Sequence, residues 1–426
     1  MITASHRPPP PDRRALFSWC LFDWANSPFP TVIITFVFAA YFTQAIVGDV
    51  VRGTALWGYA IAASGLVVAL LGPILGAIAD AGGRRKPWLF ACSVVTIGGG
   101  LLLWRAEPDP SSVLWVLVCV AAANASFELG MVFYNAMLPG LARTGRMGRL
   151  SGWGWALGYA GGLVCLMVAL YGFVQASPPP FGLDPEQAEH VRAVAPLAVL
   201  WFAAFGWPLF AFVPDSTAAR APLGRAVRRG LTKLWSTLSE FRRNRMIFRF
   251  LIARMFYIDG LNTLFAFGGI YAAGTFGMDV ADVIVFGIAL NVTAGLGALA
   301  FAWVDDWIGA KRTLVISITG LIGFASAALL APSKSWFWAA ALGLGVFIGP
   351  VQSASRSMMA RLAPAERETE MFGLFALSGR VTAFAGPVLV AWVTLAMGSQ
   401  RAGMATILVF LVIGLVLLLP LPDPDR

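Results

Sequence analysis

The sequence predicts an all-α integral membrane protein with twelve transmembrane helices in two six-helix halves. Three observations carry this prediction. Of the 426 residues, 58% are hydrophobic and 12% are charged, against about 25% charged in an average soluble domain. Apolar runs of about 20 residues, long enough to cross a hydrocarbon core of ~30 Å, recur along the whole chain. Related motifs also occupy matching positions in the two halves.

The apolar runs place the predicted spans. The first half, residues 1–213, contains runs at 17–47, 54–79, 88–104, 112–138, 149–172 and 194–213. The second half, residues 247–426, contains runs at 247–273, 280–304, 312–331, 335–361, 370–397 and 401–420. Between the halves lies a basic segment, 214–246. Its apolar residues recur at helical spacing, which is typical of a helix lying on the membrane surface, and a solvated linker is the alternative; they are Leu231, Leu234, Trp235, Leu238 and Phe241.

The distribution of basic residues predicts the orientation. Alternate loops hold most of the 31 Lys and Arg, whereas the other set holds only Arg52, Arg105, Arg192, Lys334 and Arg401. Because basic loops stay in the cytoplasm, both termini are expected to be cytoplasmic. The formal charge of +9 is then explained by orientation and by attraction to anionic membrane lipids. It does not indicate a nucleic-acid partner.

Two motifs are repeated at nearly constant offsets. Asp23, Asn26 and Ser27 in "FDWANSPF" correspond to Asp259, Asn262 and Thr263 in "IDGLNTLF". The loop "GAIADAGGRRKP" after the second span corresponds to "AWVDDWIGAKR" after the eighth. An even number of spans per half makes this a parallel repeat, with the two halves related by an axis along the membrane normal.

The loop motif in a chain of six plus six spans resembles the major facilitator superfamily. Five segments resemble, more narrowly, its vacuole-effluxer-like branch: "FDWANSPF", "YNAMLPGLA", "SGWGWALGYAGG", "QSASRSMMARLAP" and "FGLFALSGRVTAFAGP". The resemblance covers essentially the whole chain. It implies a secondary transporter, with amino-acid efflux known for a fungal member. Because this chain is compact and rich in Arg, a bacterial inner (plasma) membrane is the expected location.

The resemblance also implies that the two loop motifs form a cytoplasmic gate, whose ion pairs hold the halves together and break as the halves rock. The second motif departs from the first, with Ala302 in place of glycine and the basic pair shifted, so a weaker second gate is expected. The expected gating residues are Gly76, Asp80, Gly83, Arg84, Arg85, Asp306, Gly309, Lys311 and Arg312.

Six ionisable residues fall inside the predicted spans: Asp23, Glu128, Arg254, Asp259, Arg356 and Arg380. Such residues are costly in hydrocarbon and usually face the bundle interior, where they mark substrate pathways. The alternative explanation for these six residues is that they form three structural ion pairs and neutralise one another. Polar side chains on the same helical faces favour an aqueous binding cavity. The expected substrate-binding residues are Asp23, Asn26, Ser27, Asn124, Glu128, Asn135, Tyr257, Asp259, Asn262, Thr263, Gln352, Arg356 and Arg380.

Neighbouring acids and arginines suit a zwitterion. Arg356 or Arg380 is expected to hold a carboxylate bidentately, and Asp23 or Asp259 to meet an amino group. Another anionic cargo would use the same arginines. For proton coupling, Glu128 is the first candidate, because no basic residue lies between Val113 and Leu141; Asp23 and Asp259 follow.

The predicted function is therefore alternating-access transport of a small polar or zwitterionic solute, amino-acid-like and exported, with protons as a candidate second partner. A lipid-like or other anionic metabolite, or a sensor or scaffold without transport, are the alternatives. Enzymatic motifs are absent from the sequence, and the two histidines and four cysteines show no metal-ligand spacing. We therefore expect no catalytic residues, no cofactor and no metal. A monomer is expected.

Overall fold

The computed structural model describes residues 12–142, 146–215, 223–239, 245–278 and 280–424. Within these residues the regular structure is entirely helical. The first bundle contains α1 (Arg13–Asn26), α2 (Val37–Tyr41), α3 (Val50–Gly82), α4 (Lys86–Leu102), α5 (Val113–Ala136), α6 (Leu138–Leu141), α7 (Met147–Ala169), α8 (Glu189–Arg192) and α9 (Val194–Phe212). The second contains α11 (Arg245–Phe276), α12 (Val280–Ile308), α13 (Ala310–Leu329), α14 (Lys334–Leu362), α15 (Glu368–Ser378), α16 (Ala385–Met397) and α17 (Gln400–Leu418).

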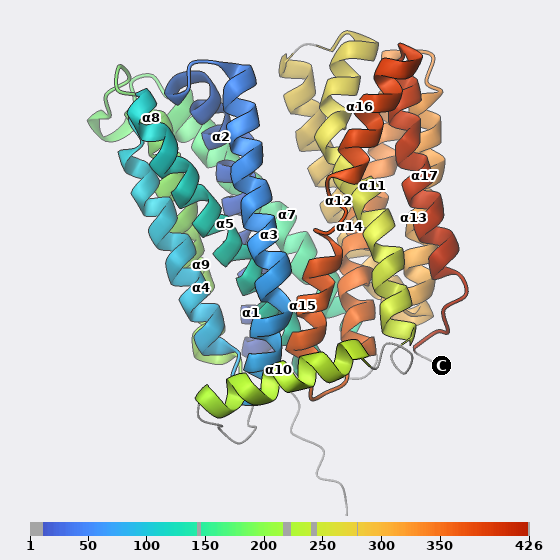
Figure 1. Cartoon of the computed structure of the whole chain (residues 1–426). Coiled ribbons are helices and arrows are strands. Elements are labelled where there is room, and N and C mark those ends of the chain that lie inside the picture. The colour runs from blue at the N-terminus through green and yellow to red at the C-terminus, as the bar shows by residue number, and fades with distance from the viewer. Residues whose placement is uncertain (1–11, 143–145, 216–222, 240–244, 279, 425–426) are drawn as a thin grey trace, which may run out of the picture.

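The two bundles stand side by side and touch mainly at one end (Figure 1). There α10 (Leu223–Ser239) lies crosswise beneath the membrane-crossing helices, and α17 ends on the same side. We call this side the α10 end. Towards the opposite side, the far end, the α1–α9 bundle and the α11–α17 bundle diverge (Figure 1). In the described part of the chain, eleven helical segments are long and apolar enough to cross a membrane.

Helix α10 makes up the described part of the basic segment. Its Gly230 packs so closely on α3 that an added Cβ would lie 2.8 Å from the backbone nitrogen of Ile78. Leu231 and Trp235 remain exposed. Phe241, which the sequence places on the same face, lies outside the described residues.

The first span, 17–47, is less regular than the sequence indicates. Helix α1 ends at Asn26, and a π-helix follows at Phe29–Phe36. Pro28 has no N–H with which to bond the carbonyl of Trp24 four residues earlier. The indole of Trp201 on α9 donates to that carbonyl instead, at 3.4 Å.

The predicted eleventh span, 370–397, is wrong as one continuous helix. Helix α15 ends at Ser378 and α16 begins at Ala385, so the chain is interrupted around Arg380. The last carbonyls of a helix need partners outside it. Arg254 of α11 supplies one, because its guanidinium donates to the carbonyl of Phe375 at 2.7 Å. Together, α15, the interruption and α16 form the eleventh membrane segment along the chain, which with the eleven long spans makes twelve and fits the predicted fold.

Candidate functional site

Arg356 of α14 forms a sealed ion pair between the two bundles. Arg356 Nη1 lies 2.9 Å from Asp23 Oδ2 of α1, and the two side chains are 3% and 8% exposed. Arg356 Nε donates to Ser151 Oγ at 2.9 Å, and Nη2 donates to the Ser151 carbonyl at 2.6 Å. Asn135 accepts a longer bond, and the guanidinium lies over the ring of Trp19. The side chains predicted to bind substrate are here occupied by one another.

A glycine of α7 makes room for this pair. A Cβ added at Gly154 would lie 2.3 Å from Asp23 Oδ2 and 2.8 Å from Arg356 Nη2. Atoms cannot approach so closely without displacement, so any side chain at this position would separate the ion pair. The glycines of this helix therefore bring backbone close to the charged groups, beyond their general role in helix packing.

A second ion pair between the bundles is more accessible. Arg380, in the interruption between α15 and α16, contacts Glu128 of α5 through Nη2. Both side chains are 28% exposed, which distinguishes this pair from the sealed one. The stem of Arg380 also passes 3.8 Å from the position of a Cβ at Gly65 of α3. A solute that reaches the interior could therefore meet a carboxylate and a guanidinium held side by side.

The remaining two embedded charges are not paired with each other. Arg254 donates to Ser378 Oγ at 2.8 Å and stacks on the ring of Phe375, 3.5 Å from its centroid. It therefore holds the end of α15. Asp259 is 2% exposed, and within the described residues no side chain bonds its carboxylate, which faces the backbone of Gly386. Its closest surroundings include Gly386 of α16, where an added Cβ would lie 3.2 Å from Asp259 Oδ1.

The other predicted substrate-binding residues are scattered. Asn124 donates to Ser64 of α3 at 2.6 Å, Gln352 accepts from Tyr159 at 2.6 Å, and Tyr257 shares a hydrogen bond of 2.8 Å with Ser355. Ser27 and Thr263 each bond the carbonyl one turn earlier on their own helices. Asn26 is buried beside Met131, whereas Asn262 is exposed. The structure does not gather these amides and hydroxyls into one cluster.

The first loop motif joins the bundles at the α10 end. Arg85 pairs with Asp80 of its own motif at 3.3 Å and with Glu368 of α15 at 2.6 Å. Asp80 accepts hydrogen bonds from Thr369 Oγ1 at 2.6 Å and from the Glu370 backbone N–H at 2.8 Å. A carboxylate at a helix N-terminus stabilises the unpaired N–H groups found there. Gly83 has a φ of +74°, a turn conformation that suits glycine.

The second motif repeats part of this arrangement. Asp306 accepts from the Gly148 N–H at the start of α7 at 2.7 Å and pairs with Arg149 at 2.6 Å. Gly309 has a φ of +90°. Arg361 of α14 pairs with Asp305 at 2.6 Å. Each motif thus places one carboxylate on the first turn of a helix in the other bundle.

Three basic residues of the motifs lie elsewhere. Lys311 donates to the carbonyls of Leu419 and Leu421 beyond the end of α17, and Arg312 lies 3.7 Å from Asp423. Both therefore contact their own half of the chain. For Arg84 the described residues provide no hydrogen bond or ion pair. Sequence reasoning missed Glu368, Thr369, Arg149 and Arg361, whose positions carry no motif of their own.

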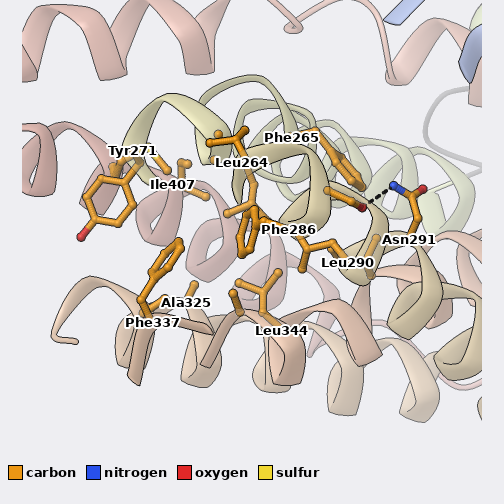
Figure 2. A pocket seen from close by; sticks show the side chains of 18 of the residues that line it. Leu264, Phe265, Tyr271, Phe286, Leu290, Asn291, Ala325, Phe337, Leu344 and Ile407 are labelled. Atoms are coloured by element: carbon orange, nitrogen blue, oxygen red, sulfur yellow. Dashed lines mark hydrogen bonds between the residues drawn. The ribbon is translucent and has the colours of Figure 1, made fainter. Parts of the chain in front are cut away.

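An apolar cavity of about 380 Å³ lies mainly within the second bundle, and the sequence did not indicate it (Figure 2). Phe265, Phe286 and Phe337 contribute aromatic rings, and the π-helix of the first bundle closes one side with Thr31 and Phe36. Asn291 is among the few polar side chains at its wall, and its amide donates to the carbonyl of Gly287 at 2.8 Å. Such a wall would accept an apolar group of a solute.

Metal ligands are not concentrated anywhere in the described part of the chain. There, no three His, Cys, Asp or Glu side chains lie close enough together to hold a metal ion. Cys20, Cys92, Cys119 and Cys165 are all unpaired thiols.

Leucine at Gly76 is expected to prevent closure at the α10 end. An added Cβ there would lie 2.5 Å from the carbonyl oxygen of Thr369. Overpacking of this kind costs about 1–3 kcal/mol, which shifts an open–closed equilibrium by about 5- to 150-fold. Spin labels at the exposed positions Gly140 and Glu366, after removal of the native cysteines, report the distance between the halves.

Gly98→Leu is the matched control for this measurement, because an added Cβ at Gly98 meets no atom within 4 Å. The distance distribution of the control should equal that of the parent protein. If the Gly76→Leu protein has the same spin-label distance distribution as the parent protein, the close approach of α3 and α15 does not govern closure.

Comparison with known proteins gives a consistent result. Residues 43–424 match the family model described as "Vacuole effluxer Atg22 like". The chain is 27% identical to the Bacillus subtilis protein named "Uncharacterized MFS-type transporter YxiO" over 95% of this chain and 94% of that one. It is 23% identical to autophagy-related protein 22 of Cryptococcus neoformans, over 62% of this chain and 51% of the fungal protein.

Solved structures of major facilitator transporters share the fold. The proton:xylose symporter XylE matches with a TM-score of 0.72 at 13% identity, covering 96% of each chain. The human organic anion transporter MFSD10 matches with a TM-score of 0.71 at 15% identity, covering 97% of this chain and all of that one.

Proposed function

The chain belongs to the Atg22-like vacuole effluxer family of the major facilitator superfamily, and we propose that it exports a small zwitterionic, amino-acid-like solute in exchange for protons. The relatives support efflux, because the family model is described as "Vacuole effluxer Atg22 like" and the chain resembles fungal autophagy-related protein 22. Transport proceeds by alternating access, in which the two halves rock about a central site.

One observation carries the choice of solute. Glu128 and Arg380 form an ion pair between the halves and are both 28% exposed. A zwitterion can bind both members of this pair in place of their contact with each other. Its carboxylate binds the planar guanidinium of Arg380 bidentately, and its amino group binds the carboxylate of Glu128. Arg356 and Asp23, by contrast, are sealed and occupied by one another. We therefore assign substrate binding to the accessible pair and a locking role to the sealed pair.

The orientation follows from the basic residues at the α10 end. Arg225, Arg228 and Arg229 of α10 join Arg84 and Arg85 on this side, which the positive-inside rule places in the cytoplasm. Both termini are then cytoplasmic. The loop motifs form the closed cytoplasmic gate, and the arrangement described above faces outward. The similarity to a bacterial transporter over nearly the whole chain favours a bacterial plasma membrane.

We assign the coupling proton to Asp259. The sequence favoured Glu128, but Glu128 has a guanidinium partner in this arrangement. Asp259 is buried, and among the described residues no side chain pairs with its carboxylate, whose polar neighbour is the backbone of Gly386. An uncompensated buried carboxylate is costly, so a change of surroundings during the cycle would load or release its proton. Gly386, beside the interruption of the eleventh span, is the neighbour that such a movement would displace.

The apolar cavity favours a second candidate. A cavity of about 380 Å³ lined by Phe265, Phe286 and Phe337 suits a solute with a large apolar group. An amphipathic or lipid-like solute would place its apolar part in this cavity.

Ligand-induced thermal stabilisation tests the assignment of the accessible pair. A ligand that binds the folded state raises the unfolding temperature by mass action. We expect apolar amino acids to stabilise the protein more than the corresponding amines or carboxylic acids. Arg380→Gln should abolish stabilisation by every carboxylate. Glu128→Gln should reduce the stabilisation by amino acids. It should increase the stabilisation by carboxylic acids that lack an amino group, because the Glu128 carboxylate no longer competes with them for Arg380.

The matched control is Arg225→Gln, at an exposed position of α10, which should leave all ligand responses unchanged. Equal stabilisation of the parent protein and Arg380→Gln by amino acids would contradict the assignment. A preference of the parent protein for amphipathic anions over amino acids would favour the second candidate function.

A further inference from the structure

A groove on the outer surface of the protein runs along the seam between the two halves. It has a volume of about 800 Å³ and is formed by α1 and α7 of the first half and α12 of the second. Its wall is apolar, and several of its side chains are open to the surroundings: Phe17 is 62% exposed, Trp153 40% and Leu296 60%. On a protein that spans the membrane, this surface faces lipid.

Two arginines lie at the α10 end of the groove. Arg13 begins α1, Arg146 directly precedes α7, and both line the groove and are exposed. Among the described residues neither guanidinium has a hydrogen-bond or ion-pair partner, and the wall of the groove contains no acidic residue. The mouth of the groove is thus positively charged and complementary to an anion.

The length of the groove fits one lipid chain. Along α7 its wall extends from Leu150 to Leu163, which is about 20 Å at 1.5 Å per residue. One leaflet contributes half of a hydrocarbon core of ~30 Å. The apolar wall therefore covers the depth of one leaflet and ends in cationic groups at the level of the headgroups.

We propose that this groove is a binding site for an anionic phospholipid. One acyl chain lies along α7 and α12, and the phosphate group is held by Arg13 and Arg146. Guanidinium groups bind phosphate bidentately, and each basic residue near an anionic surface adds about fivefold in affinity. The proposal does not depend on the identity of the transported solute.

The position of the groove also connects lipid binding to the rocking of the halves. Along the same seam Gly152 packs on Ala302, with 2.5 Å between an added Cβ and the Ala302 Cβ. Gly295 also packs on Tyr159, with 3.2 Å between an added Cβ and the Tyr159 Cβ. Separation of α7 from α12 would split the groove. A lipid that binds the intact groove therefore favours this arrangement over one in which the helices part.

Lipid titration of the purified full-length protein tests the site. Native mass spectrometry would compare phosphatidylglycerol with phosphatidylcholine of identical acyl chains. We expect phosphatidylglycerol to bind the parent protein more tightly. Arg13→Gln and Arg146→Gln should each lower the affinity for phosphatidylglycerol about fivefold, and the double variant should lower it about 25-fold. Ala160→Trp, at an exposed position of the wall, should weaken both lipids by filling the groove.

The control is a double variant of α10, Arg225→Gln with Arg228→Gln, which removes equal charge at exposed positions outside the groove. It should bind phosphatidylglycerol as the parent protein does. Three outcomes would overturn the proposal: equal binding of the two lipids by the parent protein, unchanged binding by the Arg13 and Arg146 double variant, or an equal loss in the α10 control.

Discussion

Arg356→Ala is expected to lower the free energy of unfolding by about 3–5 kcal/mol, the usual cost of removing one partner from a buried ion pair. The substitution leaves the Asp23 carboxylate uncompensated and removes the guanidinium bonds to Ser151 and Asn135. Measurement of unfolding in mixed micelles gives the difference from the parent protein.

A double variant separates the effect of leaving one charge unpaired from the effect of losing side-chain packing. Asp23→Asn with Arg356→Gln removes both charges together, and we expect it to be more stable than Arg356→Ala alone. Arg228→Ala, at an exposed position of α10, controls for the loss of an arginine as such. If Arg356→Ala is as stable as the parent protein, or if the double variant is no better than Arg356→Ala, the pair does not lock the halves.

Asp259→Asn is expected to reduce proton-driven net flux at least tenfold while leaving exchange of solute across the membrane active. An amide has the shape of the carboxyl group but cannot carry the coupling proton. Flux in proteoliposomes with and without a pH gradient measures both activities. The parent protein should respond to the gradient, and Asp259→Asn should not.

Asp282→Asn makes the same chemical change at a partly exposed acid that contacts Lys334, and it should keep the response to the gradient. Glu128→Gln distinguishes the coupling site suggested by the sequence from the one assigned to Asp259. A full response to the gradient in Asp259→Asn, with its loss in Glu128→Gln, would return the coupling role to Glu128.

The sequence predicted the fold and the repeated elements well, because these depend on local patterns. Long apolar runs and two related loop motifs are sufficient to predict twelve membrane segments in two halves. The eleventh segment was an exception, since an apolar run does not show whether its backbone is continuous. Gly379, next to the end of α15, and Pro387, in the first turn of α16, were the available signals.

The sequence could not predict which side chains form ion pairs between the two halves. Six embedded charges of zero sum indicated pairing, but the pairing of Asp23 with Arg356 and of Glu128 with Arg380 depends on how the bundles pack. The same holds for Glu368, which meets Arg85 across 283 positions of sequence. The shifted basic residues of the second loop motif suggested a weaker gate, and the structure places Lys311 on the end of α17.

Solute counterflow in proteoliposomes tests the central claim most directly. Vesicles that contain the purified protein are loaded with an unlabelled apolar amino acid, diluted into the labelled form, and followed without any ion gradient. We predict transient accumulation of label by the parent protein, and none by Arg380→Ala. Absence of accumulation by the parent protein across all amino acids, or undiminished accumulation by Arg380→Ala, would contradict transport of a zwitterion through the Glu128–Arg380 site.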